Sequence, residues 1–157
     1  MKHTLSVLVE NKPGVLARVA GLFSRRGFNI DSLAVGVTDK PEISRMTVVV
    51  DVEEHSLEQV YKQLNKLINV IKVIDLPDDN RVQREMVLAK VKAEPRNRAE
   101  IIEIVEIFRG KIVDLGSGTL SVEVTGPGSK LRAFEDLLRP YGLVEMVRTG
   151  TIALPRG

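Results

Sequence analysis

Polar and apolar residues alternate near the start of the chain, and the spacing then changes to that of a helix. Leu5, Val7 and Val9 alternate with polar neighbours, which is the period of a strand with one buried face. Over residues 15–23 the apolar positions recur every three or four residues instead. The pattern predicts a strand followed by a helix over about residues 13–26.

The rest of the chain repeats this order of periods. The predicted strands cover residues 28–38, 43–52, 70–74, 86–94, 111–115, 120–125 and 143–147, and the predicted helices cover residues 56–68, 99–108 and 130–138. Turn-forming and charged residues at 77–81 separate two series of the form βαββαβ. We therefore predict an α+β protein with two ferredoxin-like domains, residues 1–77 and 82–157.

The composition sets limits on the chemistry. With 157 residues, of which 43% are hydrophobic, the chain can bury a core without help from crosslinks. It has no cysteine, which excludes disulfides and zinc sites of the cysteine type. Its 23 basic and 21 acidic residues nearly balance, so charge gives no case for a nucleic-acid partner. No apolar run is long enough to span a membrane, and we expect an unexported, cytoplasmic protein with no membrane partner.

The turn between the first strand and the first helix is the best candidate for a binding site. The first turn of a helix presents unpaired N–H groups and the positive end of the helix dipole, which suit a carboxylate or a phosphate. Asn11 adds an amide that can donate and accept hydrogen bonds. Two interpretations fit the sequence: a small-anion site, or an ordinary strand-to-helix turn capped by Asn11.

No catalytic or metal-binding pattern is evident. His3 and His55 lack a carboxylate at a spacing that suggests a catalytic dyad, and no set of metal ligands stands out. The glycine-rich residues 126–130 lack the Gly-Lys-Ser/Thr order of a phosphate loop, and indicate a strand-to-helix turn capped by Ser129. The predicted strand at 43–52 has no aromatic residue, which argues against an RNA-binding sheet. We expect a protein that is not itself an enzyme and binds no metal.

Longer stretches of sequence resemble a known family. They are residues 5–11, 13–19, 21–33, 44–47 and 58–67 in the first half, and 84–85, 88, 90–91 and 107–114 in the second. In these stretches the chain resembles the small regulatory subunit of acetolactate synthase, also called acetohydroxyacid synthase. The resemblance implies that residues 1–77 form an effector-binding ACT domain, and that residues 82–157 form the second domain typical of that subunit.

The resemblance also implies a function. Small subunits of this family bind a large catalytic subunit, raise its activity, and confer feedback inhibition by valine in branched-chain amino acid biosynthesis. Thiamine diphosphate, magnesium and FAD are then expected in the catalytic partner, and no cofactor in this chain. The chain is expected to form a homodimer through its ACT domains. The alternative is a stand-alone ACT-type amino-acid sensor that regulates another partner.

The resemblance assigns the effector site by position. The matching effector-loop residues are Asn11, Gly14, Val15 and Leu16, and their counterparts across an ACT dimer interface are Asn29 and Ile30. In such a site the ligand carboxylate would meet the helix N-terminus, and its ammonium group would meet carbonyl or amide oxygens. We expect a side chain at Gly14 to occupy the space of the ligand.

Overall fold

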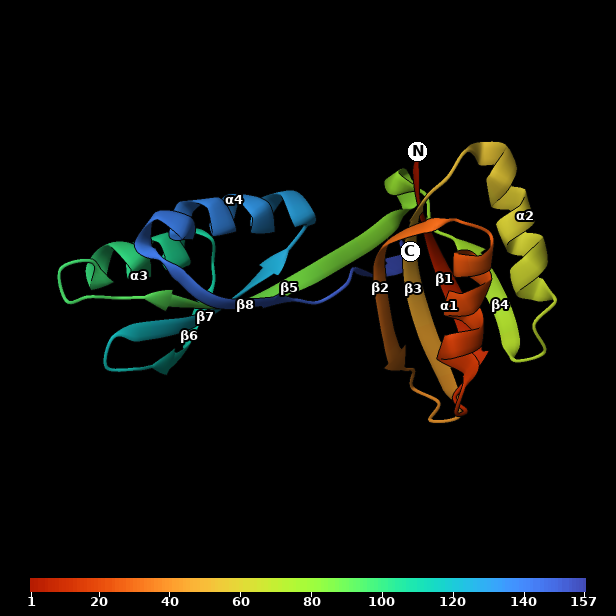
Figure 1. Cartoon of the computed structure of the whole chain (residues 1–157), viewed down its shortest axis with the longest axis horizontal. Coiled ribbons are helices and arrows are strands. Elements are labelled where there is room, and N and C mark those ends of the chain that lie inside the picture. Colours follow the sequence, from red (N-terminus) through yellow and green to blue (C-terminus); the bar gives the residue numbers. More distant parts are fainter. The chain divides into compact units, whose positions relative to one another are not determined.

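The computed structural model describes all of residues 1–157 and divides into two compact units. The first unit contains Met1–Val82 together with Gly150–Gly157, and the second contains Gln83–Thr149 (Figure 1). None of the helices combines the length and the apolar composition needed to cross a membrane. Each unit is described by itself below.

The first unit is built on a four-stranded antiparallel sheet. Its elements are β1 (Lys2–Glu10), α1 (Val15–Arg25), β2 (Asn29–Val37), β3 (Ile43–Asp51), α2 (Glu54–Asn65) and β4 (Val70–Asp75). The strand order is β2-β3-β1-β4, which leaves β2 and β4 at the edges (Figure 1). β1 and β3 pair along their whole length, from Lys2 opposite Asp51 to Glu10 opposite Ile43. This order confirms the predicted ferredoxin-like arrangement.

The core of this unit lies between the sheet and its two helices. Alternate residues of β1 and β3, such as Val7 and Val48, pack with Phe23 of α1 and Leu64 of α2. Burial of these side chains is the main force that holds the helices on this face of the sheet. The opposite face carries small polar residues, of which Ser6 accepts a hydrogen bond from the Arg45 guanidinium.

The second unit repeats the same topology. Its elements are β5 (Arg81–Lys92), which begins in the first unit, α3 (Arg98–Ile107), β6 (Lys111–Leu115), β7 (Thr119–Gly126), α4 (Gly128–Leu138) and β8 (Leu143–Arg148). A short 3₁₀ turn, Arg139–Tyr141, precedes β8. The strand order β6-β7-β5-β8 corresponds strand by strand to that of the first unit. Phe108 and Phe134 meet edge to face in its core, with ring centroids 5.3 Å apart.

Several predicted boundaries differ from the structure. α1 begins at Val15 and not at Pro13, because Gly14 has a backbone conformation that a helix does not contain. β5 begins at Arg81, five residues earlier than predicted, and the predicted linker contains a 3₁₀ turn at Asp78–Asn80. Ser129 does not cap α4, whose N-cap is Pro127 with no side-chain hydrogen bond.

The last eight residues group with the first unit by their contacts, while the sequence predicts that they belong to a second domain, residues 82–157. The backbone N–H of Thr151 donates to the Ser32 hydroxyl at 2.7 Å, and that of Arg156 donates to the Asn80 carbonyl at 3.1 Å. These residues include a short strand, β9 (Ile152–Pro155), which pairs with β5 as a fifth strand of the second sheet. The contacts form between residues far apart in the sequence, so local periodicity could not indicate them.

Candidate functional site

The turn before α1 is shaped by Gly14. This residue is the N-cap of α1 and has φ 84° and ψ −10°, the left-handed conformation. A residue with a Cβ pays roughly 1–2 kcal/mol to adopt it. No atom lies within 4 Å of the position that a Cβ on Gly14 would occupy. Glycine is therefore required by the backbone, while the space beside it within the chain is open.

The start of α1 has hydrogen-bond donors without partners. No side chain caps the helix, and the N–H groups of Leu16 and Ala17 donate to no acceptor in the chain. The first regular helical bond runs from Arg18 N–H to the Gly14 carbonyl, at 3.1 Å. Together with the helix dipole, the free N–H groups form a place that suits a carboxylate.

Asn11 holds the turn to the neighbouring hairpin. Its side-chain Nδ2 donates to the Pro41 carbonyl at 3.0 Å, and its backbone N–H donates to the Glu42 carbonyl at 2.8 Å. The interpretation of Asn11 as the helix cap is therefore wrong. One of the two N–H donors of the amide is engaged by Pro41, so the side chain can still offer a ligand its oxygen and its second N–H.

Val15 and Leu16 point in different directions. The Val15 side chain is 3% exposed and belongs to the core, so this residue can contact a ligand only through its backbone. Leu16 is 47% exposed and presents an apolar side chain at the surface beside the turn. The resemblance assigns both to the site, and of the two only Leu16 presents its side chain at the surface.

Asn29 and Ile30 lie at the opposite end of the sheet from the turn. Asn29 pairs with Asp51, which pairs in turn with Lys2 at the start of β1, whereas Asn11 follows Glu10 at the end of β1. Eight residues of strand separate the two ends, about 26 Å at the usual rise per residue. A single chain therefore does not bring the two groups of predicted site residues together.

β2 has one edge free of strand partners in its sheet. From Ser32 opposite Val49, β2 pairs with β3 in a regular register. At the end of this stretch the N–H of Thr38 donates to the Ile43 carbonyl, so residue 38 has its backbone groups directed at β3. Antiparallel pairs alternate, so the even-numbered residues of this stretch direct their backbone groups at β3. Leu33, Val35 and Val37 then direct theirs outward. Gly150 approaches this edge at Leu33, so the part of the edge that can accept another strand is at Val35 and Val37.

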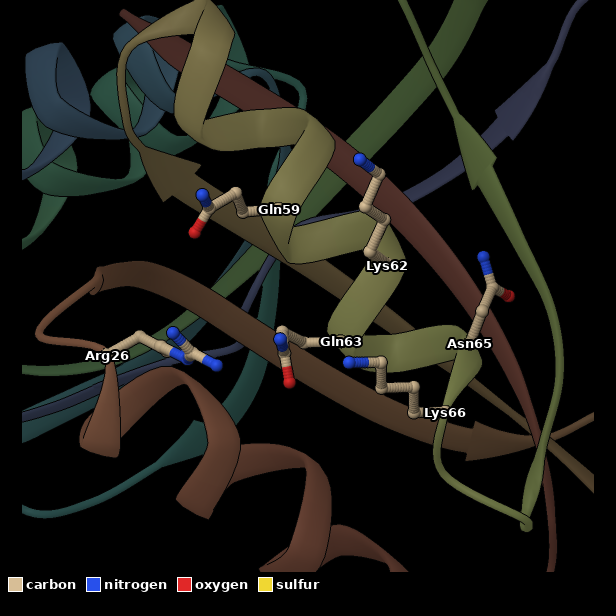
Figure 2. A pocket seen from close by; sticks show the side chains of 6 residues that line it. All are labelled: Arg26, Gln59, Lys62, Gln63, Asn65 and Lys66. Carbon is tan, nitrogen blue, oxygen red and sulfur yellow. The ribbon is translucent and has the colours of Figure 1, made fainter.

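A separate hollow of about 560 Å³ lies between the helices of the first unit (Figure 2). It is lined by Arg26, Gln59, Lys62, Gln63, Asn65 and Lys66. The three cations have no ion-pair partner, and they occur at the last turns or C-caps of α1 and α2, where positive charge complements the helix dipole. Each of its lining side chains ends in an amide or a cationic group.

Titratable groups form no set typical of catalysis. Burial, followed by the charge of Asp75, raises the pKa of Tyr61 to about 12, so its hydroxyl remains protonated at neutral pH. The pKa of Tyr141 is also raised, mainly by the hydrogen bond that its hydroxyl donates to Glu100. No three His, Asp or Glu side chains lie close enough together to hold a metal ion.

Two protein families match the chain, one for each half. Residues 5–72 match the family described as the AHAS small subunit-like ACT domain, and residues 84–157 match the family described as the small subunit of acetolactate synthase. The chain belongs to the acetolactate synthase small-subunit family. The match confirms the predicted family, and it confirms that the first domain is an ACT domain.

Individual relatives agree along the full length. The chain is 56% identical over 155 residues to the acetolactate synthase small subunit of Mycolicibacterium smegmatis, covering 99% of this chain and 91% of that protein. It is 55% identical over 157 residues to the probable acetolactate synthase small subunit of Archaeoglobus fulgidus, covering 100% and 98%. The crystal structure of the acetolactate synthase small subunit from Thermotoga maritima superposes with a TM-score of 0.95 at 44% identity, and it covers 100% and 98% of the two chains.

Proposed function

We propose that this chain is the regulatory small subunit of an acetolactate synthase, that it activates the large catalytic subunit, and that it confers feedback inhibition by valine. Full-length similarity to small subunits supports the association with a large subunit. The observation that carries the effector role is the open glycine turn at the uncapped start of α1. Thiamine diphosphate, magnesium and FAD then belong to the large subunit.

The chemistry of valine fits this turn. Its carboxylate would accept from the free N–H groups of Leu16 and Ala17, with help from the helix dipole. Its ammonium group would donate to the side-chain oxygen of Asn11, which Pro41 leaves free. The isopropyl group would pack on the exposed Leu16 side chain. Selectivity among valine, leucine and isoleucine would depend on the shape of the pocket around the side chain of the ligand.

A second copy of the chain would complete the site. If two β2 strands pair antiparallel along the part of the edge at Val35 and Val37, which residues 150–157 do not cover, the Asn29 end of one lies beyond the Val37 end of the other. Val37 pairs with Ser44, which pairs with Val9, so this is the end of the sheet that carries Asn11 and Gly14. A homodimer of this kind would bring Asn29 and Ile30 of one protomer to the turn of its partner.

Regulation requires valine to favour one arrangement of the dimer over another. Binding across two protomers makes such a preference possible, because the contacts of the ligand depend on how the protomers are placed. A coupling free energy of roughly 1–3 kcal/mol is typical of allosteric effectors. The same reasoning would serve a stand-alone amino-acid sensor, which would bind the effector and act on a different partner.

Titration of valine into the purified chain tests the proposal, with leucine and isoleucine as comparison ligands. Asn11→Ala should weaken valine binding, because it removes both the contact to the ammonium group and the bond that fixes the turn. Asn65→Ala is the matched control, since Asn65 is also an exposed asparagine but lines the cationic hollow. Its affinity for valine should equal that of the wild type.

Reconstitution with the large subunit separates the two functions. The wild-type chain should raise acetolactate formation and make it sensitive to valine, and Asn11→Ala should retain the activation. Activation without any valine binding or inhibition would contradict the effector role. Valine binding without any effect on the large subunit would favour the stand-alone sensor. Turnover of pyruvate by the isolated chain would show that it is an enzyme.

A further inference from the structure

The C-terminal segment of the chain touches the backbone of β2 in its middle. A Cβ placed on Gly150 would lie 2.5 Å from the Leu33 carbonyl oxygen and 3.0 Å from the Ser32 hydroxyl. The next residue, Thr151, donates its N–H to that hydroxyl at 2.7 Å, and its own surface is only 7% exposed. Residues 150–151 and 32–33 thus form a close backbone contact between parts of the chain 119 positions apart. We call residues 150–157 the C-terminal tail.

The tail meets β2 at an irregular point. The pairing of β2 with β3 shifts register between Ile30 and Ser32, which is the position of a β-bulge at Asp31. The extra residue of a bulge is not paired in the ladder. Asp31 is held instead by an ion pair with Lys2 at 3.1 Å and by a hydrogen bond that it accepts from the Asn29 side chain at 2.9 Å. Contacts of this kind, outside the ladder, help to position the strand next to the bulge. The tail supplies one at Ser32, directly after the bulge. On the other side of the bulge stand Asn29 and Ile30, the residues assigned to the effector site.

Only glycine permits this approach. The Leu33 carbonyl belongs to the strand backbone and cannot rotate away, so any side chain at position 150 would displace the tail. Gly150 has no unusual backbone conformation, and its requirement comes from the close approach alone. The Leu33 carbonyl also points toward the outer edge of β2, where the alternation of backbone groups leaves it free of β3.

We propose that Gly150 and Ser32 are positioning residues for the effector response: the tail clamps β2 beside its bulge and so sets the placement of Asn29 and Ile30. This inference rests on the proposed function, because it concerns the same effector site. The tail follows β8 of the second unit after a single residue, Thr149, whose N–H donates to the Met86 carbonyl. The peptide chain thus connects β8 directly to the residues that contact β2.

Gly150→Ala tests the clamp, and Gly36→Ala is its matched control. Gly36 lies on the same strand β2, has no left-handed conformation, and would place its Cβ with no atom within 4 Å. Ser32→Ala removes the hydroxyl that accepts from Thr151, while Ser32→Thr retains a hydroxyl and should rescue the effect. All four variants are made in the full-length chain and assayed alone and with the large subunit.

Hydrogen exchange of the ligand-free chain reports the clamp directly. Gly150→Ala and Ser32→Ala should increase exchange at residues 29–35, whereas Gly36→Ala and Ser32→Thr should match the wild type. The valine dissociation constant should rise about tenfold for Gly150→Ala, since small displacements of a binding group are costly. Activation of the large subunit should persist, which a general loss of folding would not allow.

The outcomes separate this inference from the proposed function. If the wild type binds valine and Gly150→Ala binds it equally well, the positioning role is wrong and the effector site stands. If exchange at residues 29–35 is the same in Gly150→Ala and in the wild type, the clamp is likewise refuted. If the wild type neither binds valine nor responds to it in the complex, the proposed effector role fails first, and the positioning role fails with it.

Discussion

Gly14 has a left-handed backbone conformation that favours glycine, and the space beside it is open. The two properties together are what we expect of a turn that binds a ligand. Gly14, in its left-handed conformation, precedes α1, whose first N–H groups, like those of any helix, have no acceptor within the helix. In many helices a serine or asparagine side chain occupies that place as a cap. Here it is left vacant, since Asn11 is held by Pro41 in the hairpin turn. The vacancy is the physical basis for proposing that a ligand carboxylate takes the role of the cap.

Gly14→Asp should abolish inhibition by valine and leave activation of the large subunit largely intact. The new carboxylate would lie at the helix start, where it competes with the carboxylate of the ligand for the same N–H groups. It would also occupy the open space beside the turn. The measurement is acetolactate formation in the reconstituted enzyme as valine is increased. Equal inhibition of the wild type and the variant would show that the site lies elsewhere.

Gly14→Ala separates backbone strain from occupation of the site. Alanine meets no neighbouring atom but is forced into the same left-handed conformation, which should cost roughly 1–2 kcal/mol of stability. It leaves most of the ligand space open and adds no charge. Inhibition should therefore survive in Gly14→Ala to a greater extent than in Gly14→Asp. If both variants lose it equally, distortion of the turn is the cause, and not competition for the N–H groups.

At the scale of elements, an ion-pair cluster joins three parts of the second unit. The Arg148 guanidinium, at the end of β8, lies 3.6 Å from the Glu135 carboxylate of α4 and 3.7 Å from the Glu85 carboxylate of β5. Both glutamates are largely buried, with side chains 10% and 16% exposed. Buried carboxylates are costly unless a cation balances them. Arg148 therefore fixes the end of β8 against α4, just before the tail begins.

Arg148→Met should lower the free energy of unfolding by about 2 kcal/mol, because Glu135 would remain buried without its cation. Arg139→Met is the control: Arg139 and Asp136 lie 3.9 Å apart with side chains 63% and 76% exposed, and such a pair contributes about 0–1 kcal/mol. Urea denaturation followed by circular dichroism measures both. If the two variants lose similar amounts of unfolding free energy, the burial of Glu135 is not what makes the loss of Arg148 destabilising.

Helices and strands with a clear hydrophobic period could be predicted from the sequence. Features that depend on a backbone conformation, or on contacts with residues far away in the sequence, could not. The alternation along Leu120, Val122 and Val124 is enough to place β7, because each of these side chains is buried in one core. The early start of β5 and the start of α1 have no such signal. Pro13 is compatible with a first helical position, and only the conformation of Gly14 excludes it. The tail is held by contacts with Ser32 and Asn80, far away in the sequence, and no local pattern of residues indicates these contacts.

At the scale of the whole molecule, the sequence predicted two units because each buries an apolar face of its own. The grouping of the candidate site residues into one effector site came from the resemblance to the family, and the hydrophobic periodicity gave no indication of it. Asn29 and Asn11 lie at opposite ends of one sheet, and nothing in a single chain joins them. Their joint role requires a second protomer. The oligomeric state is therefore the property on which the proposed site depends.

Pairing through β2 can be tested with charges at the two edges of the first sheet. Val35 on β2 is 46% exposed and Ile71 on β4 is 52% exposed, so both are accessible apolar residues on edge strands. Val35→Asp should shift the chain from dimer to monomer, because a two-fold interface brings each substitution toward its copy and a charge on an edge strand opposes pairing. Ile71→Asp should leave the dimer intact.

Light scattering after size-exclusion chromatography gives the masses of both variants, and valine titration of each variant shows how its oligomeric state affects ligand binding. A monomer produced by Ile71→Asp alone would place the interface at β4, where Asn29 of one protomer could not reach Gly14 of the other.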